Sequence, residues 1–295
     1  MSTIVVTGAV GGVGSWTVEG LAADGHRVVA IDRERPDGGR ENVDFYAADL
    51  TDQGETWELI MDADPDYVVH FAAIPDPTGD PGRVVFENNV TSTYNVLDAA
   101  GRVGADVVWA SSESAYGFPF AAELPLPERL PITEEHPLEP EDPYGTSKVA
   151  GEEVAKAIAR RDGIRVASLR LSWVQYPGRY HAGGDPGVER GTPMTGNYWT
   201  YIDVRDVVEA VRAAMDADFE GEEAFNVHAD ENATGTDTVE LFERAFGDVP
   251  EPCDVEGEEC PFSTAKAKEM LGWEPAHDWR SVEGESEEAP SFVSP

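Results

Sequence analysis

Apolar runs of strand length recur along the first 171 residues, and most of them precede a segment whose apolar positions repeat at helical spacing. Strands that alternate with helices indicate a parallel sheet covered on both faces, and right-handed crossovers make it a doubly wound α/β fold of the Rossmann type. We expect strands at residues 3–7, 27–31, 43–47, 67–73, 106–111 and 165–171. We expect helices at residues 13–23, 55–61, 83–103 and 143–161.

The alternation stops after residue 171. A stretch rich in glycine and proline at residues 176–198 is typical of a loop, and it is followed by shorter elements. These are predicted helices at 204–215, 236–245 and 264–271 and a strand at 224–227. We therefore divide the chain into a Rossmann domain at 1–171, a small C-terminal region at 172–280 whose last elements return to the Rossmann core, and an acidic tail at 281–295 that we expect to be flexible.

The charge of the chain is strongly negative. Its 295 residues hold 21 Lys and Arg against 58 Asp and Glu, a net charge of −37, spread along the whole length. No basic patch is available to neutralise phosphates, so nucleic acid and anionic membranes are not expected partners. The hydrophobic share of 41 % is enough for a folded core. Spread acidity with few lysines resembles the surface of proteins from salt-loving archaea, where concentrated salt screens repulsion between like charges.

Neither a membrane span nor a metal site is predicted. No run of 18 apolar residues occurs, and the first strand follows Met1 too closely to leave room for a signal peptide, so we expect a cytoplasmic protein. Two cysteines among carboxylates, Cys253 and Cys260, are too few soft ligands for a zinc site. We interpret them as free thiols in a reducing compartment.

Glycines follow the first strand at regular spacing. Gly8, Gly11 and Gly14 lie three residues apart just before the first helix. Such a turn lets the backbone approach a pyrophosphate, and the helix N-terminus supplies free N–H groups and the positive end of its dipole. Asp32, at the end of the second strand, would accept hydrogen bonds from a ribose diol, which favours NAD. Arg33 and Arg35 come next, and either could pair with a 2′-phosphate, so NADP stays possible.

Tyr144 and Lys148 are four residues apart and therefore share one helix face. The ordinary tyrosine pKa of about 10 is too high for a base at neutral pH. A neighbouring ammonium favours the phenolate, so we expect Lys148 to lower the pKa of Tyr144. Lysine is rare in this chain, and its compact charge suits this position better than the wider guanidinium of arginine.

Eight motifs occur in order along nearly the whole chain: TGAVGGVG (7–14), ADL (48–50), HFAA (70–73), NNVTSTYNVLDAA (88–100), ASSESAYG (110–117), PYGTSK (143–148), YIDVRDV (201–207) and LGWEP (271–275). Together they resemble the extended short-chain dehydrogenase/reductase family, also called the NAD-dependent epimerase/dehydratase family. Within it, the chain looks most like the sugar and uronate dehydrogenases, including small haloarchaeal ones.

The resemblance implies a role for each matching residue. Ser112 would hold the substrate oxygen, Tyr144 would move the proton, and Lys148 would tune Tyr144 and hold the nicotinamide ribose. Asn89 matches the family's helix asparagine. The implied cofactor-binding residues are Gly8, Gly11, Gly12, Val13, Gly14, Asp32, Arg33, Asp49, Leu50, Phe71, Ala72, Ala73, Tyr144 and Lys148. The family usually forms homodimers through the helices near 83–103 and 143–161, so we expect a homodimer.

Three departures from the family pattern bear on the reaction. Dehydratases carry an acidic pair after the active serine or threonine, and here Ser114 follows Glu113. Nucleotide-sugar enzymes carry an asparagine where this chain has Trp173, and they use a longer substrate segment than 177–201. We therefore expect NAD(P)-dependent oxidation of the anomeric carbon of a free monosaccharide to a lactone. The alternative is a nucleotide-sugar 4-epimerase or reductase of the same family.

The substrate's other end is left open by the sequence. A uronate or a sugar phosphate would need a cation, for which Arg179 and Arg190 are candidates. A neutral aldose would use polar and aromatic groups, and we favour it slightly because Glu113 would repel a carboxylate. The expected substrate-binding residues are Ser112, Glu113, Ser114, Trp173, Gln175, Arg179 and Trp199, with Asn197 and Tyr198 as further candidates. A cofactor sensor without turnover is a third class, which the presence of both Tyr144 and Lys148 disfavours.

Overall fold

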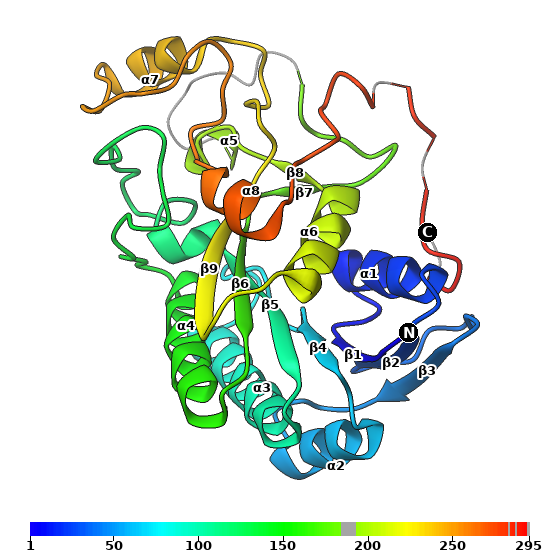
Figure 1. Ribbon diagram of the computed structural model, residues 1–295. Helices are drawn as coiled ribbons and strands as arrows, with labels where there is room; N and C mark the ends of the chain where they lie inside the picture. The colour runs from blue at the N-terminus through cyan, green and yellow to red at the C-terminus, as the bar shows by residue number, and fades with distance from the viewer. Residues whose placement is uncertain (184–192, 283, 287, 294–295) are drawn as a thin grey trace.

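A seven-stranded sheet runs through the protein in the order β3-β2-β1-β4-β5-β6-β9 (Figure 1). The computed structural model describes residues 1–183, 193–282, 284–286 and 288–293. All neighbouring strands pair in parallel. The strands are β1 (Thr3–Thr7), β2 (Arg27–Asp32), β3 (Val43–Ala47), β4 (Tyr67–His70), β5 (Asp106–Ser112), β6 (Val166–Leu171) and β9 (Glu222–Val227). The order reverses between β1 and β4, where ligands bind in doubly wound sheets.

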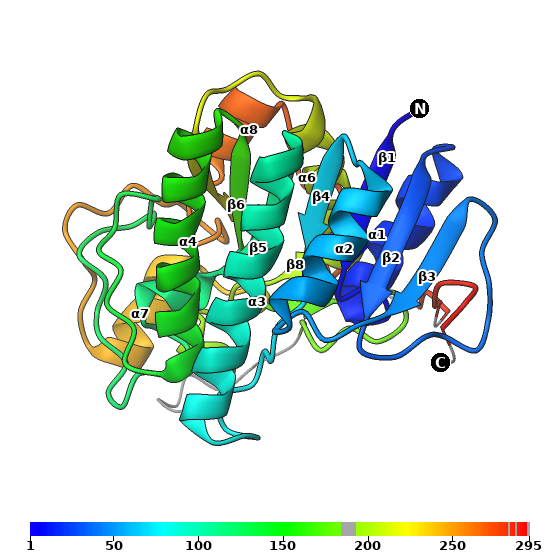
Figure 2. The same ribbon diagram turned by 90° about the horizontal axis from the view of Figure 1, so that it is seen from below.

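Helices cover both faces of the sheet, as predicted (Figure 2). One face carries α2 (Gln53–Ala63), α3 (Gly82–Val103) and α4 (Pro143–Asp162). The other carries α1 (Gly12–Ala23), α6 (Val204–Asp216) and α8 (Ala265–Leu271). Successive β1 residues point alternately toward the two helix layers, since Val5 packs in one hydrophobic cluster while Ile4 and Val6 pack in the other. Side chains alternate along a strand, so a strand covered on both faces is apolar throughout.

The start of α4 is fixed by its own sequence. The Asp142 carboxylate accepts hydrogen bonds from the Tyr144 and Gly145 amides, both 2.8 Å long, and Pro143 occupies the first turn. Farther along, Gly151 lets the helix pack closely on Trp109, because a Cβ there would lie 2.6 Å from the indole. These contacts place Tyr144 and Lys148 beside the carboxyl end of β5.

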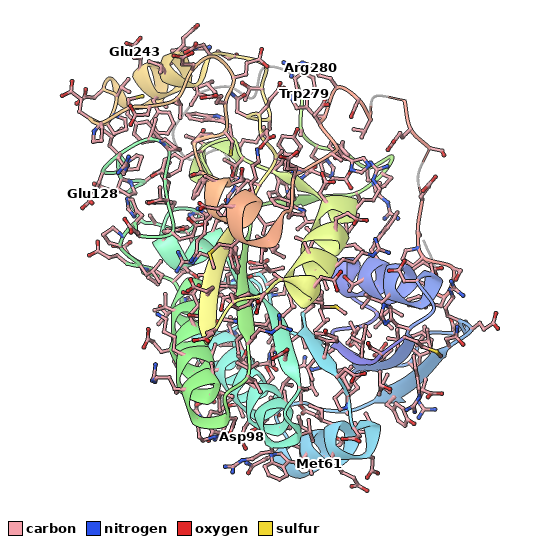
Figure 3. All side chains as sticks on the ribbon, in the orientation of Figure 1. Met61, Asp98, Glu128, Glu243, Trp279 and Arg280 are labelled. Atoms are coloured by element: carbon pink, nitrogen blue, oxygen red, sulfur yellow. The ribbon has the colours of Figure 1, made fainter. Side chains whose placement is uncertain are left out.

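The C-terminal region builds one end of the molecule. It includes β7 (Val174–Gln175), β8 (Ile202–Asp203), the short α5 (Pro193–Gly196) and α7 (Thr238–Phe246). The one-turn helix η1 (Glu113–Tyr116) follows β5 directly. Figure 3 shows Trp279 and Arg280 at this end and Met61 and Asp98 at the opposite end of the fold. The sequence did not predict the β7–β8 pair, because two-residue strands are too short to show a period.

Most element boundaries shift by only one or two residues from the sequence prediction, and two larger differences stand out. β4 ends at His70, so residues 71–73 leave the sheet and turn over Gly8, whose missing Cβ would lie 2.7 Å from the Ala72 amide nitrogen. In the predicted tail, Phe292 is buried and packs on Phe45 with ring centroids 5.0 Å apart. The tail's flexibility in solution stays a prediction, although this contact ties its end to β3.

Among the described residues, no helix is long and apolar enough to cross a membrane. The cytoplasmic location expected from the sequence stays a prediction.

Candidate active site

Two cavities adjoin at the carboxyl edge of the sheet, where the strand order reverses. The first encloses about 310 Å³ and the second about 530 Å³. They share Gly8, Gly11, Phe71 and Ala73, so together they form one elongated site across the glycine loop. An elongated site of this kind suits a dinucleotide, with its pyrophosphate at the loop.

The glycine loop has the geometry that the sequence predicts. Gly8 has a φ of +67°, which a residue with a side chain rarely adopts. A Cβ on Gly14 would lie 2.0 Å from the Gly8 carbonyl oxygen, so only glycine lets α1 start this close to β1. The Gly11 amide donates a 3.0 Å hydrogen bond to the Gly8 carbonyl and closes the turn. The loop therefore presents the N-terminus of α1 to the site, and its residues fit a bound pyrophosphate.

The first cavity gathers residues expected to hold the adenosine half of the cofactor. The Asp32 carboxylate lines it and accepts hydrogen bonds from the amides of Val10, at 3.0 Å, and Arg33, at 2.7 Å. The Arg33 guanidinium donates a hydrogen bond to the side chain of Asn88. Backbone and side-chain hydrogen bonds from Thr51 hold the pKa of Asp49 below its usual value. The predicted residues on this cavity are Gly8, Gly11, Asp32, Arg33, Asp49, Leu50, Phe71, Ala72 and Ala73.

The second cavity holds the predicted catalytic residues. Ser112 is the last residue of β5, and its hydroxyl accepts a 3.1 Å hydrogen bond from the Ser114 amide. Tyr144 faces the same cavity. Burial raises the pKa of Tyr144 to about 12, although its hydrogen bond with Ser112 lowers it in part. The predicted residues Gly12, Val13, Gly14, Ser112, Tyr144 and Lys148 all line this cavity.

Lys148 is deeply buried beneath the cavity. Its Nζ donates a 2.6 Å hydrogen bond to the Ala110 carbonyl oxygen and lies 5.3 Å from the centre of the Tyr144 ring. Burial lowers the pKa of Lys148 to about 7, against a smaller opposite effect of Glu152. The net shift of the Tyr144 pKa is upward, because burial of the phenol outweighs its hydrogen bond with Ser112. The lowering of this pKa by the Lys148 ammonium stays a prediction, and burial of Lys148 acts against it.

Asn89 does not line either cavity. Its amide group accepts a hydrogen bond from the Ile74 amide at 2.8 Å and donates to the Ile74 carbonyl at 3.0 Å and to the Ser147 hydroxyl at 3.2 Å. Asn89 thus joins α3 to α4 and to the segment after β4. This arrangement makes Asn89 a positioning residue, and its predicted catalytic part stays a prediction.

The lining of the second cavity contains only some of the predicted substrate residues. Ser112, Glu113, Ser114, Trp173 and the further candidate Asn197 line it. The sequence missed lining residues that no motif marks: Pro75, Pro119, Phe120, Ser172, Val174 and Tyr176.

Three expected contacts are not on this cavity. Gln175 is buried and accepts a 2.8 Å hydrogen bond from the His181 amide. Trp199 is fully buried and packs on Phe242, with ring centroids 5.6 Å apart. Arg179 lies in an exposed loop, and Arg190 falls outside the described residues.

Glu113 lies in a buried polar cluster at the floor of the second cavity. It accepts a 3.0 Å hydrogen bond from Thr200, and its Oε2 lies 4.0 Å from Nδ1 of the buried His228. Burial raises the pKa of Glu113 to about 8. The carboxyl group of Glu113 is therefore largely neutral at pH 7. It repels a substrate carboxylate less than the ionised Glu113 expected from the sequence would.

This arrangement is that of a nicotinamide-dependent oxidoreductase: a glycine loop leads into a cavity with a half-buried tyrosine, a buried lysine and a buried serine. The chain belongs to the NAD dependent epimerase/dehydratase family, whose model matches residues 4–227. It is thus an NAD-dependent oxidoreductase of that family, as the motifs predicted.

Individual relatives carry different activities. An L-arabinose 1-dehydrogenase (NAD(P)(+)) of Haloferax volcanii is 37 % identical over 59 % of this chain and 68 % of that protein. A UDP-glucose 4-epimerase of Lactobacillus helveticus is 26 % identical over 93 % of this chain and 92 % of that protein. A crystal structure of UDP-galactose 4-epimerase is 28 % identical, with a TM-score of 0.67 over 95 % of each chain.

Proposed function

We propose that this protein is an NAD(P)-dependent sugar 1-dehydrogenase that oxidises the anomeric carbon of a free, neutral aldose to a lactone. One observation carries the choice of substrate. Among the described residues that line the second cavity, Lys148 alone has a cationic side chain. Its ammonium group is hydrogen-bonded to the Ala110 carbonyl, at the end of the cavity proposed for the nicotinamide. A diphosphate, a phosphate or a uronate carboxylate would meet no cation from these lining residues at the substrate end.

The chemistry follows from three side chains. The Ser112 hydroxyl orients the anomeric oxygen, and Tyr144 takes its proton as a phenolate. When bound, the oxidised nicotinamide supplies a hydride acceptor and a positive charge at this end of the site. A positive charge beside the phenol favours the phenolate and offsets the effect of burial on the pKa of Tyr144. The protonated form of Lys148 adds to this effect.

A relative supports the same reaction. The haloarchaeal protein that is 37 % identical is named an L-arabinose 1-dehydrogenase that uses NAD(P). A pentose or hexose of the aldose series is therefore the substrate class that we propose, with either cofactor possible.

A substrate panel tests the proposal. Neutral aldoses, uronates, hexose phosphates and UDP-sugars are each incubated with NAD or NADP in molar KCl, and reduced cofactor is followed by absorbance. Net reduction with one or more neutral aldoses, and with no uronate or phosphate, is the expected result. Preference for a uronate or a sugar phosphate would contradict the neutral substrate.

The alternative is 4-epimerisation of a nucleotide sugar, which the epimerase relatives favour because they match nearly the whole chain. An epimerase regenerates its cofactor, so absorbance would stay flat while UDP-glucose and UDP-galactose interconvert. Chromatography of the UDP-sugar mixture distinguishes the two reactions.

The homodimer expected from the family is also part of the proposal. Val84 and Tyr94 are large apolar residues of α3 that are 45 % and 43 % exposed, which suits a helix that packs against a second copy. A molar mass of one chain, 31.9 kDa, measured by light scattering would contradict the homodimer.

A further inference from the structure

A fourth glycine of the loop has a packing role that the spacing of Gly8, Gly11 and Gly14 does not explain. Gly12 is the first residue of α1. A Cβ on Gly12 would lie 2.2 Å from the Tyr176 hydroxyl oxygen and 2.9 Å from the ring carbon that bears it. The phenol of Tyr176 therefore lies directly over the start of α1, and only glycine leaves room for it.

Tyr176 comes from the other side of the cavity. It follows β7 directly and lines the second cavity together with Gly11 and Gly12. Its backbone carbonyl accepts a 2.9 Å hydrogen bond from the Arg179 amide, which fixes a turn there. The side chain is half-buried, and its hydroxyl forms no hydrogen bond with another described residue.

The hydroxyl is positioned as a donor toward the loop. Burial raises the pKa of Tyr176 above its usual value, so the phenol keeps its proton at neutral pH. The N-terminus of α1 attracts an anion through its free N–H groups and its dipole, and the pyrophosphate of a dinucleotide is the anion expected at this loop.

We propose that Tyr176 is a cofactor-positioning residue whose hydroxyl donates a hydrogen bond to the pyrophosphate of the bound dinucleotide. The segment that carries Trp173 then closes over the cofactor from the substrate side. The inference rests on the cofactor site alone, so it holds whichever sugar is oxidised.

Binding experiments without sugar test this inference. Dissociation constants of NAD, ADP-ribose and adenosine are measured for the wild type and for Tyr176→Phe, which removes only the hydroxyl. We expect NAD and ADP-ribose to bind about tenfold more weakly, equivalent to about 1.4 kcal/mol, because a hydrogen bond to a charged phosphate is lost. Adenosine, which has no phosphate, should bind unchanged. The control is Tyr67→Phe, the same change at the first residue of β4, which is the end of that strand away from the site.

The inference is overturned if NAD and ADP-ribose bind Tyr176→Phe as well as the wild type, or if adenosine weakens by the same factor. An effect confined to the sugar KM would also overturn it, since Tyr176 would then contact the substrate instead.

A second variant tests the packing itself. Gly12→Ala should displace the Tyr176 phenol and weaken ADP-ribose binding in the wild-type background. In the Tyr176→Phe background, Gly12→Ala should weaken ADP-ribose binding by a smaller factor. The reason is that the closest clash, 2.2 Å from the hydroxyl oxygen, is gone. Equal costs in both backgrounds would show that the added methyl group hinders the ligand directly and would contradict the contact.

Discussion

The Lys148 ammonium group lies 5.3 Å from the centre of the Tyr144 ring and donates a 2.6 Å hydrogen bond to the carbonyl of Ala110. The two side chains are neighbours, yet burial shifts their pKa values in opposite directions, up to about 12 for Tyr144 and down to about 7 for Lys148. Each group therefore favours its neutral form more than it would in water. A positive charge brought to the cavity would favour the phenolate, which links the readiness of the base to cofactor binding.

Tyr144→Phe should abolish most turnover while NAD still binds. A positioned general base contributes about 10²- to 10⁴-fold to a rate, so kcat should fall by a factor in that range. Reduced-nicotinamide absorbance measures turnover, and a titration of NAD measures binding. Tyr67→Phe, at the far end of β4, serves as the matched control and should keep full activity. Near-normal turnover by Tyr144→Phe would show that another group is the base.

Glu113→Gln should change how stability depends on pH. The folded pKa of Glu113 is raised to about 8 by burial, so the stability that it contributes is complete below its unfolded pKa and is lost as pH rises toward 8. The Gln variant cannot titrate, and its Tm relative to wild type should therefore increase between about pH 5 and 8.

The control for this comparison is Glu128→Gln, which alters an exposed carboxylate at the edge of the molecule (Figure 3). Its Tm profile should run parallel to the wild-type profile. A parallel profile for Glu113→Gln as well would mean that Glu113 ionises normally.

Asp32→Ser should shift the cofactor preference toward NADP. Asp32 and Arg33 line the same cavity, and the carboxylate would repel a 2′-phosphate that the guanidinium could bind. The ratio of kcat/KM for NADP to that for NAD should rise about tenfold or more. Asp37→Ser, an exposed residue outside this cavity, should leave the ratio unchanged. An unchanged ratio in Asp32→Ser would remove Asp32 from cofactor selection.

Concentrated KCl should stabilise the protein. A net charge of −37 on one chain produces strong self-repulsion, and salt shortens its range from about 10 Å at 0.1 M to about 3 Å at 1 M. The Tm should therefore rise steeply over this range of KCl. Sucrose, which favours compact states without screening charge, is the control additive. The Tm should rise less steeply with sucrose than with KCl. A flat response to KCl would indicate an ordinary acidic protein and contradict the expected adaptation to salt.

The sequence alone determined the features that depend on local periodicity. The strand–helix alternation predicts a parallel doubly wound sheet, because a strand buried on both faces must be apolar throughout. The glycine spacing predicts the pyrophosphate turn, because a φ of +67° and the close approach of α1 to β1 both exclude a side chain. Likewise, the four-residue separation of Tyr144 and Lys148 places them on one helix face.

Only the tertiary structure decided what depends on contacts between distant segments. Burial of Lys148 beneath the cavity sets its charge, and no local pattern reveals how much water a side chain will lose. Trp199 turns into the core, whereas Tyr176 turns over Gly12, although both belong to segments that look alike as loops. Such choices follow from how side chains far apart in sequence fill the same volume, and that volume exists only once the chain is folded.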